Sequence, residues 1–221
     1  SLERRTVVWG HSQGGGAALW TGIQAPVYAP DANVVGVAAL SPATELPAIF
    51  DAVRDSPVGK IMGSYVLSAY AAAYPDVKVA DYIRPQALTL LRGNAGRCLS
   101  GPEALVSVAT SVATEAFFSR APSTGALGTR LGENVPLGHV EAPLLLAQGL
   151  ADALVLPSAQ QRYVRDMCAR GERVEYRTYA GFDHVGVVLD PKSPLVPDLV
   201  EWTNDRLAGK APPGGCTTSS R

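Results

Sequence analysis

The sequence contains no long apolar run and no concentration of charge of one sign. No apolar stretch approaches the roughly 18 residues that a transmembrane helix needs. Nineteen Lys and Arg residues stand against twenty Asp and Glu residues, a net charge of −1, and no basic run is present. Without a basic surface there is no electrostatic footprint for nucleic acid. We therefore expect no transmembrane segment and no nucleic-acid partner.

Cysteine is also scarce. Cys98, Cys168 and Cys216 have no metal-binding spacing, and they allow either one disulfide with a free thiol or no disulfide. The polar segment 1–5 is followed at once by a short apolar run, whereas a secretory signal needs a longer apolar region and a small-residue cleavage site. We therefore predict no metal site and no signal peptide in this chain. A cytosolic protein and a leader upstream of the segment both remain open.

The chain does have enough apolar residues to form a core. Of its 221 residues 47% are hydrophobic and 18% are charged, which excludes a generally disordered protein. At about 150 residues per domain, one core is the default for this length.

Short apolar runs that alternate with helical patterns predict a parallel sheet flanked by helices. Strands are predicted at 6–9, 33–40, 143–148 and 174–179, and helices between or after them at 17–23, 158–169 and 195–208. The nearly continuous apolar character of the second strand is typical of a sheet that is covered on both faces.

About 100 residues separate the second and third strands, and they show helical patterns without a strong strand. Helices are predicted at 46–53, 57–73, 85–91 and 102–118, and the Gly- and Pro-rich segment 122–138 is predicted to be a loop. Apolar residues in this part, among them Leu105, Val108 and Val112, are individually predicted to form helix-on-helix core. As a group they also suit the lining of an acyl pocket, and this alternative remains open.

These patterns predict an α/β core that is built from two parts of the chain. Residues 1–45 and 141–208 form the core, and residues 46–140 form a helical cap or lid insertion. Residues 209–221 have no core-forming pattern and are predicted to be a flexible tail.

The segment Gly10-His11-Ser12-Gln13-Gly14 fits the G-x-S-x-G nucleophile elbow, with a strand before it and a helix after it. Ser12 is expected in a strained turn, with glycines on both sides because side chains there would clash. Its hydroxyl would project from the carboxyl edge of the sheet, and the backbone N–H of Gln13 is the predicted oxyanion donor. The alternative, a phosphate-binding turn, lacks the Rossmann or Walker spacing.

A serine nucleophile needs a base and an acid at the same sheet edge. His184 follows the fourth strand and is the predicted base. His11 adjoins the serine and is expected to point elsewhere, and His139 precedes the third strand, at the opposite edge. Asp152 follows the third strand and is the predicted acid, because Asp183 is too close to His184 along the chain to orient its ring easily.

Ser12, Asp152 and His184 occur in the chain order of α/β-hydrolases. At this point the chain resembles the secretory lipases, the lipase A-like α/β-hydrolases with many actinobacterial members, over about residues 6–208. The resemblance rests on Gly10–Gly15, on the helical insertion after Leu40-Ser41-Pro42, on Gln148–Asp152 with Pro157, and on Cys168–Gly171 leading to Tyr179-Ala180-Gly181 and His184.

The resemblance implies an α/β-hydrolase fold with a helical cap and hydrolysis of fatty-acyl esters, with a hydrophobic ester or lipid as substrate and no cofactor. It also implies that Ser12, Asp152 and His184 are nucleophile, acid and base, and that the protein is secreted or located in the cell envelope.

The chain departs from this family in one respect: its elbow strand begins within ten residues of the first residue. We therefore expect the C-terminal part of the fold, about four parallel strands, with the N-terminal strands and the loop of the second oxyanion donor missing. Losing one such donor typically lowers the rate about 10²–10³-fold. Two alternatives follow: an inactive or incomplete lipase fragment, whose missing N-terminal half would be its partner, and a peptidase or acyltransferase with the same triad.

Overall fold

A computed structural model describes residues 5–221, and these form two compact units. The sheet unit comprises residues 5–45 and 136–221, and the helical unit comprises residues 46–135. Residues 136–140 therefore belong to the sheet unit and not to the expected insertion. Residues 1–4, which the first predicted segment includes, lie outside the described residues.

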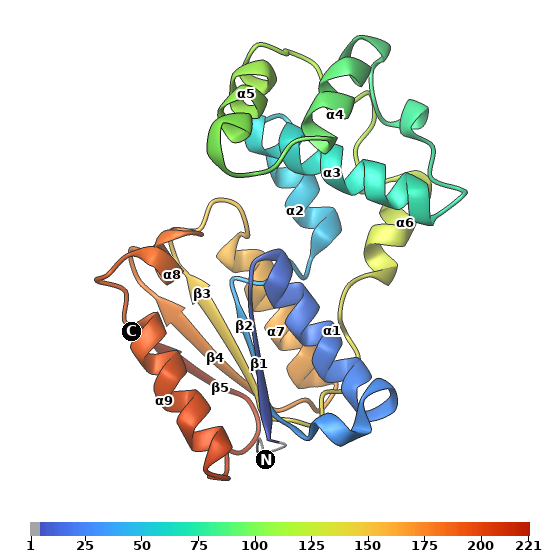
Figure 1. The fold of residues 1–221 in the computed structure, drawn as a ribbon. Helices are drawn as coiled ribbons and strands as arrows, with labels where there is room; N and C mark the ends of the chain where they lie inside the picture. The colour runs from blue at the N-terminus through green and yellow to red at the C-terminus, as the bar shows by residue number, and fades with distance from the viewer. Residues whose placement is uncertain (1–4) are drawn as a thin grey trace. The chain divides into compact units, whose positions relative to one another are not determined.

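One parallel sheet of five strands forms the centre of the sheet unit, in the order β1-β2-β3-β4-β5 (Figure 1). The strands are β1 Thr6–His11, β2 Val34–Leu40, β3 Leu144–Gly149, β4 Val174–Tyr179 and β5 Thr217–Ser220. The register aligns His11 with Leu40 and Gly149 with Tyr179. Since all strands are parallel, the residues that follow β1, β3 and β4 meet at one edge.

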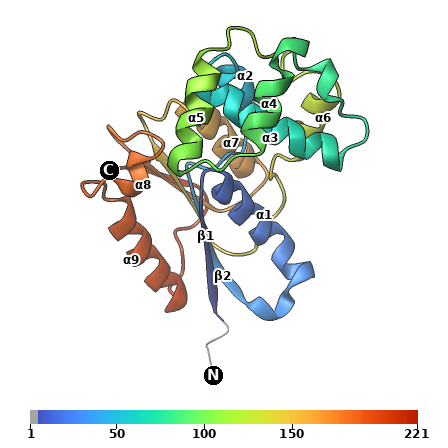
Figure 2. The same cartoon turned by 45° about the horizontal axis from the view of Figure 1, so that its top comes forward.

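Helices cover both faces of this sheet (Figures 1 and 2). They are α1 Gln13–Tyr28, α7 Pro157–Ala169, α8 Gly186–Leu189 and α9 Leu195–Leu207, with a short 3-10 turn η1 at Pro30–Ala32. Helix α1 packs on β1 and β2, α7 packs on β3 and β4, and α9 packs on β1 and β2. Because neighbouring strand residues point to opposite faces, Ala38 and Leu40 of β2 join Trp202 of α9 in one buried cluster.

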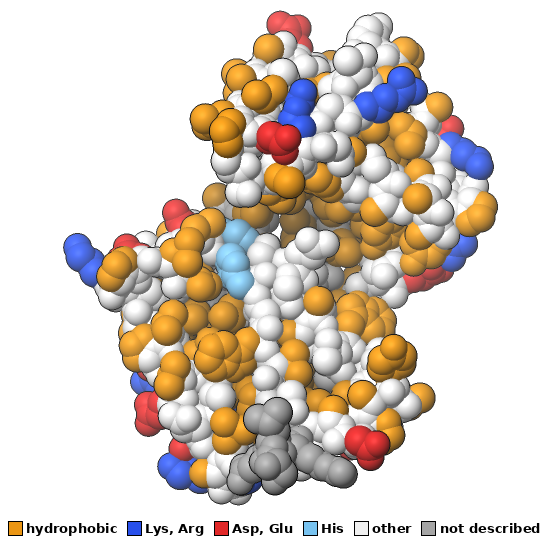
Figure 3. Space-filling model, in the orientation of Figure 1, with side chains coloured by type: hydrophobic (Ala, Val, Ile, Leu, Met, Phe, Trp, Pro, Cys, Tyr) orange, Lys and Arg blue, Asp and Glu red, His pale blue; other side chains and the backbone are white. Residues whose placement is uncertain are grey.

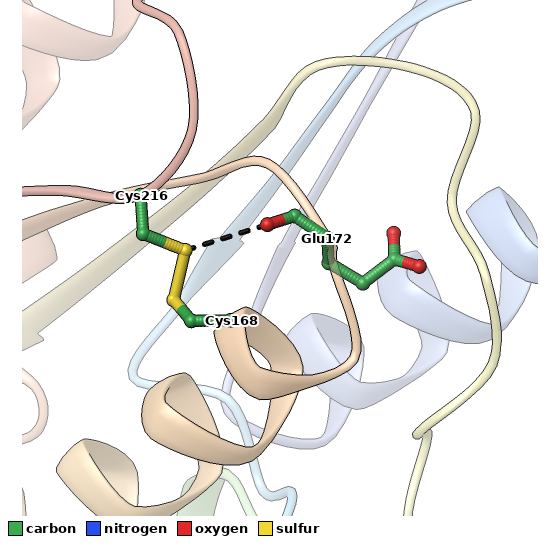
Figure 4. The surroundings of a disulfide bond; sticks show 3 residues. All are labelled: Cys168, Glu172 and Cys216. Carbon is green, nitrogen blue, oxygen red and sulfur yellow. Dashed lines mark hydrogen bonds between the residues drawn. A yellow bond between two sulfur atoms is a disulfide. The ribbon is translucent and has the colours of Figure 1, made fainter.

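The C-terminal segment differs from the flexible tail that the sequence predicts. Residues 217–220 form the fifth strand, parallel to β4, so the sheet has one strand more than expected. A disulfide between Cys168, in the last turn of α7, and Cys216 fixes the start of this strand, and the Cys216 Sγ contacts the backbone oxygen of Glu172 at 3.4 Å (Figure 4). The strand consists of Thr and Ser only, so it has no apolar pattern from which to predict it. Cys98 is a free, exposed thiol.

The helical unit contains α2 Leu46–Val53, α3 Pro57–Ala73, α4 Leu88–Ala95, α5 Gly101–Val112 and α6 Gly125–Glu133, with 3-10 turns η2 Val79–Asp81 and η3 Pro85–Ala87. Helix α6 lies in the segment predicted as a loop. It forms because Leu127 and Leu131, one turn apart, are buried in a cluster with Phe50 and Leu67. No helix within residues 5–221 is long and apolar enough to cross a membrane.

Helix α5 is turned the opposite way from the sequence prediction. Its apolar residues Leu105 and Val112 are 72% and 64% exposed, and Val108 is exposed as well. The buried side of the helix carries Ser107 and Ser111 instead. The Ser111 hydroxyl accepts a hydrogen bond from the Asn94 side-chain amide at 3.2 Å, so the inward face of this helix includes a polar contact.

Candidate active site

Ser12 occupies the sharp turn between β1 and α1. Its backbone has φ 56° and ψ −119°, a region that non-glycine residues rarely adopt and that costs conformational energy. The turn is held by backbone hydrogen bonds: Ser12 N–H donates to Leu40 at 2.9 Å, and Ser12 C=O accepts from Gly16 and Ala43. The Ser12 side chain makes no capping bond to α1, so its hydroxyl is left to face the sheet edge.

The glycines around this turn have different roles. A Cβ on Gly10 would lie 1.8 Å from the Gly14 carbonyl oxygen, and a Cβ on Gly15 would lie 2.8 Å from Cβ of Pro42. These approaches are impossible for any side chain. A Cβ on Gly14, by contrast, would meet nothing within 4 Å. The expected clash is therefore confirmed at Gly10 but wrong at Gly14.

Three predicted side chains, which come from three different loops, form one chain of hydrogen bonds. His184 Nε2 lies 2.8 Å from Ser12 Oγ, and His184 Nδ1 lies 2.7 Å from Asp152 Oδ2. A carboxylate can only accept, so the imidazole proton sits on Nδ1. Nε2 is then unprotonated and accepts the Ser12 hydroxyl. The Asp152 side chain is fully buried and that of His184 is 12% exposed.

Asp152 is held in place by both of its oxygens. Oδ1 accepts the backbone N–H groups of Leu154 at 2.9 Å and Val155 at 2.8 Å, and Oδ2 also accepts from Gln148 Nε2 at 3.0 Å. Burial by itself raises the pKa of Asp152, but the hydrogen bond and charge of His184 and the two backbone N–H groups outweigh it. The net pKa lies below its ordinary value. The carboxyl group therefore stays ionised beside the imidazole.

His139 and Asp183, which the sequence places less favourably than His184 and Asp152, contact other groups. His139 Nδ1 pairs with Glu172 Oε1 at 2.8 Å, away from the serine. Asp183 Oδ1 accepts the backbone N–H groups of Val185 and Gly186, so it supports the turn after His184.

His11 points away from the Ser12 hydroxyl but it is not remote from the site. Its Nε2 lies 2.8 Å from the backbone oxygen of His184, and the two imidazole rings are 4.8 Å apart. Histidine side chains form a patch on the surface of the sheet unit in the space-filling view (Figure 3). Sequence reasoning missed this contact, because a chain neighbour of the serine gives no signal of which distant loop it will touch.

Gln13 is the first residue of α1, where a backbone N–H has no intrahelical acceptor. The positive end of the helix dipole lies at the same place. Within residues 5–221 no group of three or more His, Cys, Asp or Glu side chains could hold a metal ion. The arrangement thus combines a serine hydroxyl, an imidazole, a buried carboxylate and a helix N-terminus, which suits nucleophilic attack on a carbonyl carbon.

Comparison with known proteins shows which family the chain resembles. The family model described as "Secretory lipase" matches residues 2–215. Three relatives, each matching over 92% or more of this chain, are Lipase 2 of Candida albicans (24% identical), a secreted triacylglycerol lipase of Malassezia globosa (26%), and a protein of Mycobacterium tuberculosis named "Probable inactive lipase" (26%).

The crystal structure of Candida antarctica lipase A superimposes with a TM-score of 0.78 at 19% identity and covers 98% of this chain, which shows a shared fold. The chain spans about half the length of the proteins it matches: it covers 49%, 48% and 45% of the three relatives and 52% of the lipase A chain.

Proposed function

The chain belongs to the secretory lipase family, and we propose that it is a serine-dependent carboxylic-ester hydrolase that acts through an acyl-enzyme. The observation that carries the proposal is the unbroken chain of hydrogen bonds from Ser12 Oγ through the His184 imidazole to Asp152. Few other functions require a serine in a strained turn, a base in contact with it and a buried acid behind the base.

In the first half-reaction, His184 Nε2 takes the Ser12 hydroxyl proton while Oγ bonds to the ester carbonyl carbon. The carbonyl electrons move to oxygen, and the N–H of Gln13 at the N-terminus of α1 stabilises the oxyanion. When the carbonyl reforms, the C–O bond to the alcohol breaks and His184 protonates the departing oxygen. Asp152 stabilises the imidazolium and keeps the ring in the correct tautomer.

In the second half-reaction, water replaces the alcohol. His184 takes a proton from the water as its oxygen attacks the acyl carbon, and collapse of the oxyanion breaks the bond to Ser12 Oγ. The carboxylic acid leaves and His184 returns the proton to the serine. The proposal needs no cofactor.

The proposed substrate is a triacylglycerol or another fatty-acyl ester, in keeping with the family description and with the Malassezia relative. Secretion is part of the proposal. It is supported by the family description and by the disulfide between Cys168 and Cys216, since disulfides persist in oxidising compartments.

A second candidate function is an inactive relative of the lipases, which the name of the mycobacterial protein favours. The two candidates differ in one measurable property, the reactivity of Ser12. A fluorophosphonate probe forms a covalent bond to serine only where a base activates the hydroxyl.

The first test is labelling of the purified 221-residue chain with a fluorophosphonate, with Ser12→Ala as control. The second test compares hydrolysis of p-nitrophenyl esters with short and long acyl chains with hydrolysis of the matching anilides. We expect labelling that disappears in Ser12→Ala, and ester hydrolysis well above amide hydrolysis. Folded wild-type protein without labelling would reject the proposal in favour of the inactive relative. Anilide hydrolysis equal to ester hydrolysis would favour a peptidase, and preferred transfer of the acyl group to an added alcohol would favour an acyltransferase.

A further inference from the structure

The loop that carries the base is tied to the strand that carries the nucleophile through a second histidine. His11 is the last residue of β1, directly before Ser12, and its ring lies beside that of His184. A carbonyl oxygen can only accept a hydrogen bond, so the 2.8 Å contact fixes the His11 tautomer: Nε2 carries the proton and donates it to the backbone oxygen of His184.

The backbone oxygen of His184 is available to His11 because of how α8 begins. In a continuous α-helix the N–H of Val188 would bond to the carbonyl four residues earlier, which is that of His184. Here Val188 N–H donates to Val185 C=O instead. The short helix α8 begins only at Gly186, and the carbonyl of His184 turns toward the end of β1.

Other contacts hold the residues on either side of His184. The N–H of Ala151, in the loop that carries the acid, donates to Phe182 C=O at 2.9 Å, and Asp183 Oδ1 accepts from Gly186 N–H at 2.6 Å. These bonds fix the loop to the acid and to α8. The bond from His11 fixes it to the neighbour of the nucleophile, and so constrains the distance on which proton transfer depends.

We propose that His11 is a positioning residue that holds the His184 main chain, and so keeps Nε2 of the base within hydrogen-bonding reach of Ser12 Oγ. This inference rests on the proposed function, since it assigns His11 to the same reaction. The charge of His11 fits the role. Burial is the main cause that lowers its pKa below the ordinary value, so the ring stays uncharged at neutral pH and does not repel the imidazolium that forms on His184.

Two substitutions separate the hydrogen bond from ring packing. His11→Phe keeps an aromatic ring of similar size but has no N–H. His11→Gln loses the ring but carries a side-chain N–H at a similar distance from the backbone. If the hydrogen bond positions the base, His11→Phe lowers kcat for a p-nitrophenyl ester about tenfold with KM within about twofold of wild type, and His11→Gln restores kcat to within about threefold. The melting temperatures of both variants, measured alongside, show whether a loss of activity simply follows a loss of stability.

A second readout does not require activity. We expect the proton between His184 Nδ1 and Asp152, whose heavy atoms are 2.7 Å apart, to give a strongly downfield NMR resonance that reports on the geometry of the base. We expect it to broaden or shift in His11→Phe and to stay near its wild-type position in His11→Gln.

The outcomes distinguish the two proposals. Wild-type protein that neither hydrolyses esters nor reacts with a fluorophosphonate rejects the proposed function, and the NMR comparison then still tests His11. Wild-type kcat and an unchanged resonance in His11→Phe overturn the positioning role. Equal losses in His11→Phe and His11→Gln overturn it as well, because they assign the effect to the shape of the imidazole and not to its hydrogen bond.

Discussion

Replacing Asp152 by Asn tests the central feature of the site with a change of one atom. Asparagine keeps the size of the side chain and an oxygen that can accept the backbone N–H groups of Leu154 and Val155, as Oδ1 of Asp152 does. The position of Oδ2 becomes the NH2 of the side-chain amide, which can only donate hydrogen bonds. In the wild type that position is an oxygen that accepts from His184 Nδ1 at 2.7 Å and from Gln148 Nε2 at 3.0 Å.

The amino group of the introduced asparagine would face the imidazole as a donor. His184 relieves this by moving its proton to Nε2, and the nitrogen that should accept the Ser12 proton is then blocked. Gln148 Nε2 would lose its acceptor at this position but keeps its bonds to the backbone oxygens of Gly149 and Val155. We expect the wrong tautomer to be the main consequence for activity, and for a serine triad it lowers kcat about 10⁴-fold. This is about 5 kcal/mol of transition-state stabilisation.

The assay is steady-state hydrolysis of a p-nitrophenyl ester together with the rate of fluorophosphonate labelling. Asp183→Asn is the matched control, because it removes the neighbouring carboxylate and the same charge while keeping an oxygen that can support the turn after His184. We expect kcat of Asp183→Asn to stay within about tenfold of wild type, since a distorted turn displaces the base only indirectly. Asp152→Asn with more than a tenth of wild-type kcat, or a larger loss in Asp183→Asn, would refute the assignment of the acid.

Three further predictions concern stability. Because the folded-state pKa of Asp152 is depressed, its carboxylate stabilises the protein above the unfolded pKa of about 3.9, and this stabilisation is lost as pH falls through the folded pKa. Between about pH 6 and 3 the melting temperature should therefore fall more in wild type than in Asp152→Asn. Parallel curves for the two proteins would contradict this. Gly10→Ala should disrupt folding, because its Cβ would lie 1.8 Å from the Gly14 backbone oxygen. Gly14→Ala places its Cβ in open space within a helix, so it should be neutral or stabilise the fold by up to about 1 kcal/mol. Equal melting temperatures for the two variants would count against the elbow geometry. Replacing Cys168 and Cys216 together by Ser should reduce the free energy of unfolding by at most about 4 kcal/mol, since the disulfide closes a loop with a sequence separation of 48. The backbone amides around β5 should also exchange their hydrogens faster. Unchanged denaturation and exchange would show that the disulfide does not hold this strand.

Local sequence patterns were sufficient to predict the class of the fold and the meeting of Ser12, Asp152 and His184 at one edge of the sheet. Strand–helix alternation predicts the parallel sheet, and the G-x-S-x-G segment predicts the turn that holds Ser12. Asp152 and His184 follow from topology, because residues after parallel strands meet at one edge. These inferences succeed because they rest on local periodicity, on backbone sterics and on the order of elements, all of which short stretches of sequence carry.

Features that depend on pairing between distant segments became visible only in the folded chain. The strand Thr217–Ser220 has no apolar pattern, and it forms because β4 offers an open edge and a disulfide fixes its start. Helix α6 forms in a glycine-rich stretch because two leucines find a buried cluster. The inward face of α5 carries Ser107 and Ser111 and not its apolar residues, and Ser111 contacts Asn94 of another helix.

The same distinction applies within the site. The sequence places His11 beside the serine, but only folding brings the His184 carbonyl within 2.8 Å of its ring. This contact joins residues 173 positions apart in the chain. A pattern of neighbouring residues specifies which groups lie on a strand or at its end, whereas the partner of each group depends on which loops the completed sheet brings together.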